Sequence, residues 1–192
     1  MSTTRAFAVP APGKAAWMFI LGVGILLPMA VVLVALAFNS GGSQRQSVAA
    51  GTVAVGLLVG IGLIGLMRRR AIELHGDTLV VKAAMYTRRT PLAAIDLDAA
   101  RTLDLREHTE LKTRWKTNGY AVPGFHAGLF SLRDGRRAFL LVTSPRVVVL
   151  PVPGDRTLLL SSEQPAALLA ALRSAAGSDS DRRRARASAD AA

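Results

Sequence analysis

The side chains able to transfer protons or hold a metal ion are three histidines and thirteen acidic residues, and there is no cysteine. The three histidines lack the spacing of metal ligands. Several carboxylates follow one strand-like run, where they more often form a solvated face than an acid–base pair. These residues are His75, His108 and His126, and Asp96, Asp98, Asp104, Glu107 and Glu110. No glycine-rich phosphate loop or nucleophile motif occurs. We therefore expect no enzyme, no metal site and no cofactor.

The most distinctive spacing lies in TRWKTNGYAVPGFHAGLF, residues 113–130. Asn118-Gly119 and Pro123-Gly124 are turn pairs, because glycine tolerates positive φ and proline fixes the preceding corner. On this structural interpretation the motif shapes a long loop and the strand that starts at Gly128. Trp115 and Tyr120 would then anchor the loop to the domain. The loop-shaping residues are Gly119, Pro123, Gly124 and Gly128.

The same stretch also has a functional interpretation. Arg114, Trp115, Lys116 and Asn118 could form a rim that binds a phosphate headgroup or a carboxylate of a partner protein. Basic residues beside a loop suit phosphate binding. They are equally ordinary on a protein surface, so the two interpretations stand side by side.

Two uncharged apolar runs precede this region, at residues 15–38 and 48–67, and a polar link at 39–47 joins them. Twenty helical residues cover the roughly 30 Å hydrocarbon core of a bilayer. The first run is about twice as long as a signal-peptide core, which favours a retained span over a cleaved signal. We therefore expect a transmembrane hairpin, preceded by a flexible tail at residues 1–14.

Positive charge sets the expected orientation of this hairpin. One end carries Arg5, Lys14 and the cluster Arg68, Arg69 and Arg70, whereas the link carries only Arg45. We therefore expect the hairpin in the cytoplasmic (inner) membrane, with both termini in the cytoplasm. The arginine cluster is either a topology anchor at the membrane surface or a specific site for lipid headgroups.

Within the second run, Thr52, Gly56 and Gly60 recur every four residues. Such a face of small residues lets another helix approach closely. It packs either against the first run of the same chain or against a second copy. The runs contain no ionisable residue, which argues against a transport path formed by this chain alone.

From Ala71 the pattern changes to short β-type runs between turn signals, including Gly76-Asp77 and Asp134-Gly135. About seven strands are expected from these candidates: Ala71–His75, Thr78–Met85, Leu92–Leu97, Thr102–Leu105, Leu129–Arg133, Arg136–Thr143, Arg146–Val152 and Arg156–Leu160. Ser161 and Gln164 resemble a capping box before a helix that starts with Pro165 and stops near Gly177. Residues 178–192 should be disordered.

The stretch 113–130 resembles the signature of a bacterial PH-like (pleckstrin-homology-like) domain family: a basic-aromatic segment, Asn118-Gly119, Pro123-Gly124, Gly128 and an aromatic residue at Phe130. The resemblance covers roughly residues 71–173 and implies an α+β chain. Its parts would be a two-helix transmembrane hairpin and a PH-like β-barrel or sandwich, closed by a C-terminal helix, at residues 68–177.

The family resemblance implies a binding module and no particular activity. Our first hypothesis is a membrane-anchored adaptor for protein partners, because the anchor already supplies membrane localisation. The alternatives are a domain that senses anionic lipid headgroups and an accessory subunit of a membrane complex. The net charge of +11 would suit nucleic acid. Two membrane spans make lipid the better match, so no nucleic-acid partner is expected.

Overall fold

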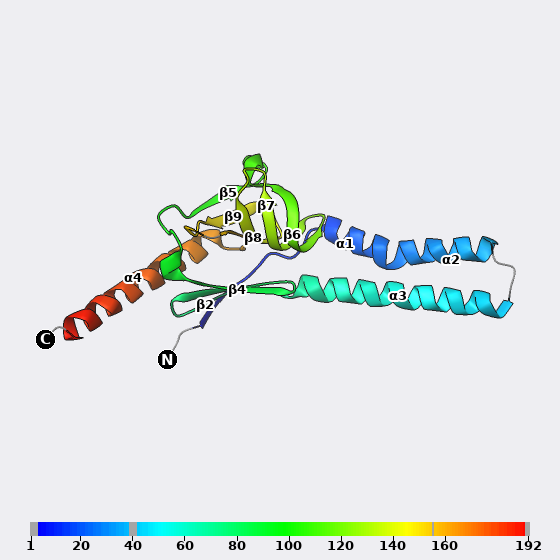
Figure 1. Ribbon diagram of the computed structural model, residues 1–192, viewed down its shortest axis with the longest axis horizontal. Coiled ribbons are helices and arrows are strands. Elements are labelled where there is room, and N and C mark those ends of the chain that lie inside the picture. Colours follow the sequence, from blue (N-terminus) through cyan, green and yellow to red (C-terminus); the bar gives the residue numbers. More distant parts are fainter. Residues whose placement is uncertain (1–3, 39–41, 155, 191–192) are drawn as a thin grey trace.

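The computed structural model describes residues 4–38, 42–154 and 156–190. Two long apolar helical segments run side by side at one end of the molecule (Figure 1). A domain of two β-sheets lies at the other end, and a long C-terminal helix leaves it on the side away from the apolar helices. The expected α+β architecture is confirmed.

The first apolar segment consists of α1 (Lys14–Leu21), a π-helical turn η1 (Gly22–Leu26) and α2 (Leu27–Phe38). The wide turn comes just before Pro28, which has no N–H to donate to the preceding turn. The second segment is a single helix, α3 (Gly42–Arg68). It starts within the stretch expected to be a polar link, and residues 39–41 of that link lie outside the described residues.

Two stretches of these helices, Lys14–Val34 and Ala50–Arg68, are long and apolar enough to cross a membrane. Most of their large side chains point outward: Leu33 is 62% exposed and Leu58 is 70% exposed. Exposed leucines on a helix of this length suit a lipid environment and not water. This match rests on the length and apolar composition of the two stretches.

The four-stranded sheet is antiparallel, with the order β1-β2-β3-β4. Its strands are β1 (Thr4–Phe7), β2 (Arg70–His75), β3 (Thr78–Ala83) and β4 (Tyr86–Pro91). The hairpin at Gly76-Asp77 forms as expected. The next strand stops two residues before its expected end, because Ala84 adopts positive φ (52°) and turns the chain into β4.

Strand β1 corrects our expectation of a flexible tail at residues 1–14. Thr4–Phe7 pairs with β2 in register from Thr4↔His75 to Phe7↔Ile72. Because β1 precedes the first apolar segment and β2 follows the second, the chain must return to the side from which it started. A hairpin that crosses a membrane would therefore carry both flanking segments on the same side.

The six-stranded sheet has the order β5-β9-β10-β8-β7-β6, with β8 and β10 parallel and the other pairs antiparallel. Its strands are β5 (Arg101–Asp104), β6 (Thr113–Val122), β7 (Phe125–Leu132), β8 (Arg137–Val142), β9 (Arg146–Leu150) and β10 (Thr157–Leu160). Short 3₁₀ turns lie at η2 (Leu92–Ala94) and η3 (Thr109–Leu111).

Two sequence-based expectations are wrong in this domain. The stretch Leu92–Leu97, expected as a strand, begins with a 3₁₀ turn after Pro91. Residues 113–122, expected as a loop, form strand β6 and pair with β7 across the Pro123-Gly124 turn. Of the two expected architectures, barrel or sandwich, the structure has the sandwich, because each sheet keeps two edge strands in the hydrogen-bonding order.

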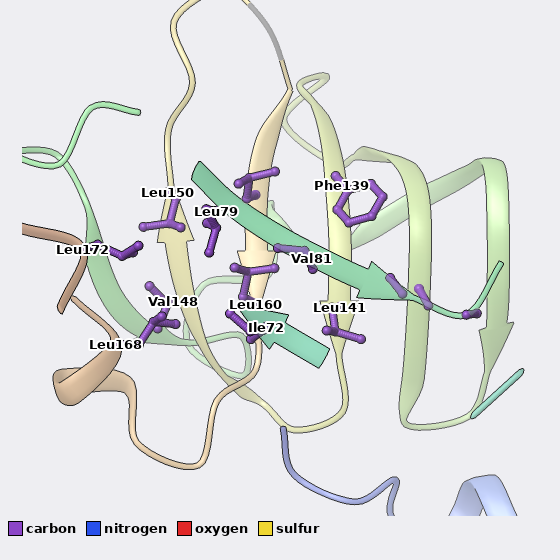
Figure 2. Close-up of a cluster of buried hydrophobic side chains, with 14 of the residues drawn as sticks. Ile72, Leu79, Val81, Phe139, Leu141, Val148, Leu150, Leu160, Leu168 and Leu172 are labelled. Carbon is purple, nitrogen blue, oxygen red and sulfur yellow. The ribbon is translucent and has the colours of Figure 1, made fainter. Parts of the chain in front are cut away.

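The main core lies between the two sheets. Ile72, Leu79 and Val81 from the small sheet face Phe139, Leu141, Leu158 and Leu160 of the large sheet (Figure 2). All of these side chains are at most 2% exposed. The core also includes Ala16, Ile20 and Met67 from the apolar helices, so the helices and the domain share one hydrophobic cluster.

Helix α4 (Pro165–Asp190) covers one end of the sandwich, where Leu168 and Leu172 are buried against the core near Val148 and Leu150 (Figure 2). It extends past Gly177 into residues expected to be disordered, where alanine and arginine have high helix propensity. Ser161 does not cap it: its Oγ accepts hydrogen bonds from the N–H groups of Thr143 and Ser144, in the turn after β8.

Candidate functional site

Strand β6 lies at the edge of the large sheet nearest the apolar helices (Figure 1). All four predicted rim residues lie on its exposed part: Arg114, Trp115, Lys116 and Asn118. Trp115 is 69% exposed, although tryptophan is usually well buried in a domain. Trp115 therefore contributes little to the core, and exposed cations precede and follow it along this edge strand.

The edge of β6 is irregular. The pairing with β7 shifts between Thr113 and Trp115 and again between Lys116 and Asn118, so Arg114 and Thr117 have no opposite residue. Bulges and basic side chains discourage an edge strand from pairing with another strand. A ligand at this edge would therefore contact side chains and would not extend the sheet.

The three arginines at the end of α3 have different environments. Arg70 Nη1 donates to the carbonyl of Met67 at 2.7 Å, which satisfies a free carbonyl at the end of the helix. Arg69 Nη2 donates to Thr87 Oγ1 of β4 at 3.3 Å, and Arg69 also accepts a backbone hydrogen bond from Ala84. Arg68 and Arg69 are exposed. Arg70 is therefore largely structural, and the other two remain available at the surface.

The structure brings the arginine cluster and the β6 residues to the same end of the domain. The Tyr86 hydroxyl donates to Asn118 Oδ1, so the start of β4 bridges to β6. The next residue of β4, Thr87, holds the Arg69 side chain. We call Arg68, Arg69, Arg114, Trp115 and Lys116 the basic-aromatic face.

Basic residues predominate around this face, and Glu73, which lines the same hollow as Thr87 and Arg89, is paired with Lys82 and His75. Strand β4 adds Arg88 and Arg89, and neither β4 nor β6 contains an acidic residue. Met85 lies in the turn that contacts Arg69 and is 56% exposed. Cations, an exposed indole and an exposed thioether together suit the interface between lipid headgroups and acyl chains.

Two motif glycines have a clear structural role. Gly119 and Gly128 pair across the β6–β7 hairpin, and Gly128 has positive φ (110°). A Cβ on Gly128 would lie 2.8 Å from Gly119 Cα and 3.0 Å from the Tyr86 ring, and one on Gly119 would lie 2.9 Å from the Phe130 ring. The missing side chains thus leave room for two aromatic rings. Pro123 and Gly124 form the hairpin turn, and Gly124 has φ 76°.

The two aromatic residues expected to anchor a loop behave differently. Tyr120 is 8% exposed and packs edge-to-face on Phe125, with ring centroids 5.6 Å apart, and burial raises the pKa of its phenol. Trp115 is exposed and anchors nothing within the domain. The reason is their position on β6: Tyr120 lies beyond the second bulge, where the strand faces the core.

The predicted helix-packing face contacts the first apolar segment. A Cβ on Gly56 would lie 2.3 Å from Pro28 Cγ, and Gly60 lies against Gly24. Thr52 lies in the same groove between the helices. These contacts fit the alternative in which the small-residue face packs within the chain.

Two of the three histidines, His75 and His108, pair with a carboxylate close to them in sequence. Glu73 accepts from Lys82 at 2.6 Å and from His75 at 2.9 Å, and these bonds hold the pKa of its carboxyl below the usual value. His108 pairs with Glu110 at 3.0 Å. Burial lowers the pKa of His126, which therefore stays neutral at pH 7. Within the described residues, no three such groups gather in a way that could hold a metal ion.

The sequence analysis missed Tyr86 and Thr87, which join the two predicted clusters. The stretch Tyr86–Pro91 is polar and ends in proline, so it carries no apolar periodicity. The signal available in the sequence was the residue types of Tyr86, Thr87 and Thr90, which favour strands.

Comparison with known proteins gives one match. A protein-family model described as "Bacterial PH domain" matches residues 70–176. Searches of curated proteins and of solved structures found no match. The matched region starts at β2 and ends within α4, so it leaves out β1 and the apolar helices.

Proposed function

The chain belongs to the bacterial PH domain family, and on this premise we propose that it is a membrane-anchored module that binds the anionic headgroups of its own leaflet. PH domains are generally non-catalytic binding modules, which agrees with our expectation of a binding module. The observation that carries the lipid assignment is the exposed indole of Trp115, which Arg114 and Lys116 flank in sequence on the edge strand of the large sheet nearest the apolar helices.

The geometry favours lipid over the protein partner that the sequence analysis placed first. That ranking assumed that lipid affinity is redundant once the chain is anchored. In the structure, the basic-aromatic face and the ends of both apolar helices lie at the same end of the domain. Each basic residue near an anionic leaflet contributes about 1 kcal/mol. Lipid contact would therefore fix the orientation of the domain on the membrane.

The fluorescence of Trp115 offers a direct test. The chain has two tryptophans, so Trp17→Phe leaves Trp115 as the single reporter. We expect its emission to shift to shorter wavelength, and to be quenched by headgroup spin labels, when the full chain is moved from phosphatidylcholine to phosphatidylglycerol nanodiscs. Replacing Arg114 and Lys116 with glutamine should remove about 2 kcal/mol of attraction, roughly a thirtyfold fall in the equilibrium constant for docking.

The matched control is Arg101→Gln with Arg146→Gln, which removes two exposed charges from the opposite part of the same sheet. This pair should leave the emission unchanged. If Trp115 reports the same environment in both lipids at low salt, the headgroup assignment is wrong. The adaptor for a protein partner would then be the better proposal, with crosslinking from Trp115 as the next step.

We also propose that the anchor lies in the cytoplasmic membrane with both termini in the cytoplasm. The pairing of β1 with β2 supports a common side for the two termini, and the arginine cluster supports the cytoplasmic side. The chain lacks cysteine, so single cysteines report topology cleanly. In intact cells an impermeant maleimide should label Gly42→Cys and should leave Arg5→Cys and Arg89→Cys unlabelled until lysis. Labelling of either arginine position before lysis would contradict this orientation.

A further inference from the structure

The large sheet is apolar on both faces, whereas only one face meets the small sheet. Its outer face carries a second cluster that includes Phe130, Leu140 and Val149, each at most 3% exposed. The cover on this face is the segment between β5 and β6, from which Leu105 and Leu111 pack onto the cluster. A single crossing segment is narrow cover for a six-stranded sheet, and it leaves a groove beside it.

The groove has a volume of about 410 Å³, which is within the range of small-molecule sites. Its floor and walls include Leu105, Leu111, Leu140 and Val142. It extends along β7 from His126 to the segment that follows the strand at Arg133, so it is long and not round. An unbranched apolar chain suits such a shape.

The charged residues that line the groove are all basic: Arg106, Lys112 and Arg133. Lys112 and Arg133 lie together, because the Arg133 N–H donates to the Lys112 carbonyl at 3.0 Å. Within residues 4–38, 42–154 and 156–190, neither side chain forms an ion pair. Three acids that flank the groove residues in sequence have partners of their own: Asp134 pairs with Arg136 at 2.6 Å, Glu110 with His108 at 3.0 Å and Asp104 with Arg106 at 3.8 Å.

We propose that this groove binds a single-chain amphipathic anion, an alkyl carboxylate taken up from the aqueous phase. The carboxylate would contact Lys112 and Arg133, and the alkyl chain would lie along Leu111, Leu140 and Val142. Two unpaired cations at one end of an apolar groove match the charge and the apolar length of such a ligand. The groove reaches the start of β6 at Thr113 but shares no residue with the basic-aromatic face.

A photoactivatable decanoate tests this assignment on the full chain in phosphatidylcholine nanodiscs. After irradiation, mass spectrometry should place the label on peptides within 105–113 and 137–145. Unlabelled decanoate should compete for this labelling, and decanol, which has the same chain without the charge, should compete at least tenfold less well. Labelling confined to the apolar helices, or equal competition by decanol, would overturn the proposal.

Two variants locate the ligand within the groove. Leu140→Trp fills the apolar part, and Lys112→Gln with Arg133→Gln removes the charge at exposed or half-exposed positions where folding is not at risk. Each should lower groove labelling about tenfold or more, and Arg101→Gln, outside the groove, should not. Unchanged labelling in the charge variant would overturn the proposal even if Leu140→Trp fails to fold. The lipid test reads the Trp115 emission in nanodiscs of two lipid compositions, whereas this test reads the position of a covalent label in phosphatidylcholine alone, so the two tests fail independently.

Discussion

Replacing Gly128 with alanine is expected to lower the free energy of unfolding of the domain by about 3 kcal/mol, because two costs coincide. A left-handed backbone costs an alanine about 1 kcal/mol or more, and Gly128 has φ 110°. Its Cβ would also lie 2.8 Å from Gly119 Cα and 2.9 Å from the Asn118 carbonyl oxygen. Both neighbours are backbone atoms, so the β6–β7 pairing itself must shift. Thermal unfolding followed by circular dichroism measures the loss.

Gly124→Ala is the matched control for this prediction. Gly124 also has positive φ (76°), in the turn of the same hairpin, but a Cβ there meets no atom within 4 Å. We expect a loss of about 1 kcal/mol from the conformational cost alone. If the two variants lose equal stability, the close approach of β6 and β7 does not matter, and the motif glycines serve only as turn formers.

This geometry shows which parts of the candidate site can be derived from sequence. The predicted turn pairs Pro123-Gly124 and Asp134-Gly135 form turns, because turn chemistry is local. Asn118-Gly119, also predicted as a turn pair, is wrong: both residues lie within β6 and pair with β7. The sequence also predicts strands β8, β9 and β10, because they are apolar runs of four to six residues. The sequence of β6 is typical of a loop, because an edge strand with two bulges exposes polar residues and loses the alternation of apolar and polar side chains.

Long-range pairing could not be derived. Thr4–Phe7 is too short to show a period, and it becomes a strand because β2 offers an open edge 60 residues further along the chain. The bond from Tyr86 to Asn118 likewise joins two sheets whose packing no local pattern encodes. For this reason the sequence alone does not predict that the arginine cluster and the β6 residues lie at the same end of the domain.

Replacing Gly56 with leucine is expected to force the two apolar helices apart. The Cβ alone would lie 2.3 Å from Pro28 Cγ and 3.1 Å from the Gly24 carbonyl oxygen, so even the first carbon of the new side chain has no room. The helix separation should grow by roughly 2 Å or more, towards the 8–10 Å usual for larger side chains. Spin labels on Leu27→Cys and Leu58→Cys, which are 58% and 70% exposed, would report the change in a chain without other cysteines.

Gly62→Leu provides the control, because a Cβ at Gly62 meets nothing within 4 Å. The two variants should also differ in the thermal stability of the domain. Met67 of α3 and Ala16 and Ile20 of α1 belong to the core of the domain, and β1 and β2 flank the two helices as a hydrogen-bonded pair. Separating the helices therefore pulls directly on the small sheet, and Gly56→Leu should lower the thermal stability of the domain as well. If the spin-label distance and the stability both stay unchanged while a larger assembly dissociates, the glycine face serves a partner helix and the chain acts as an accessory subunit.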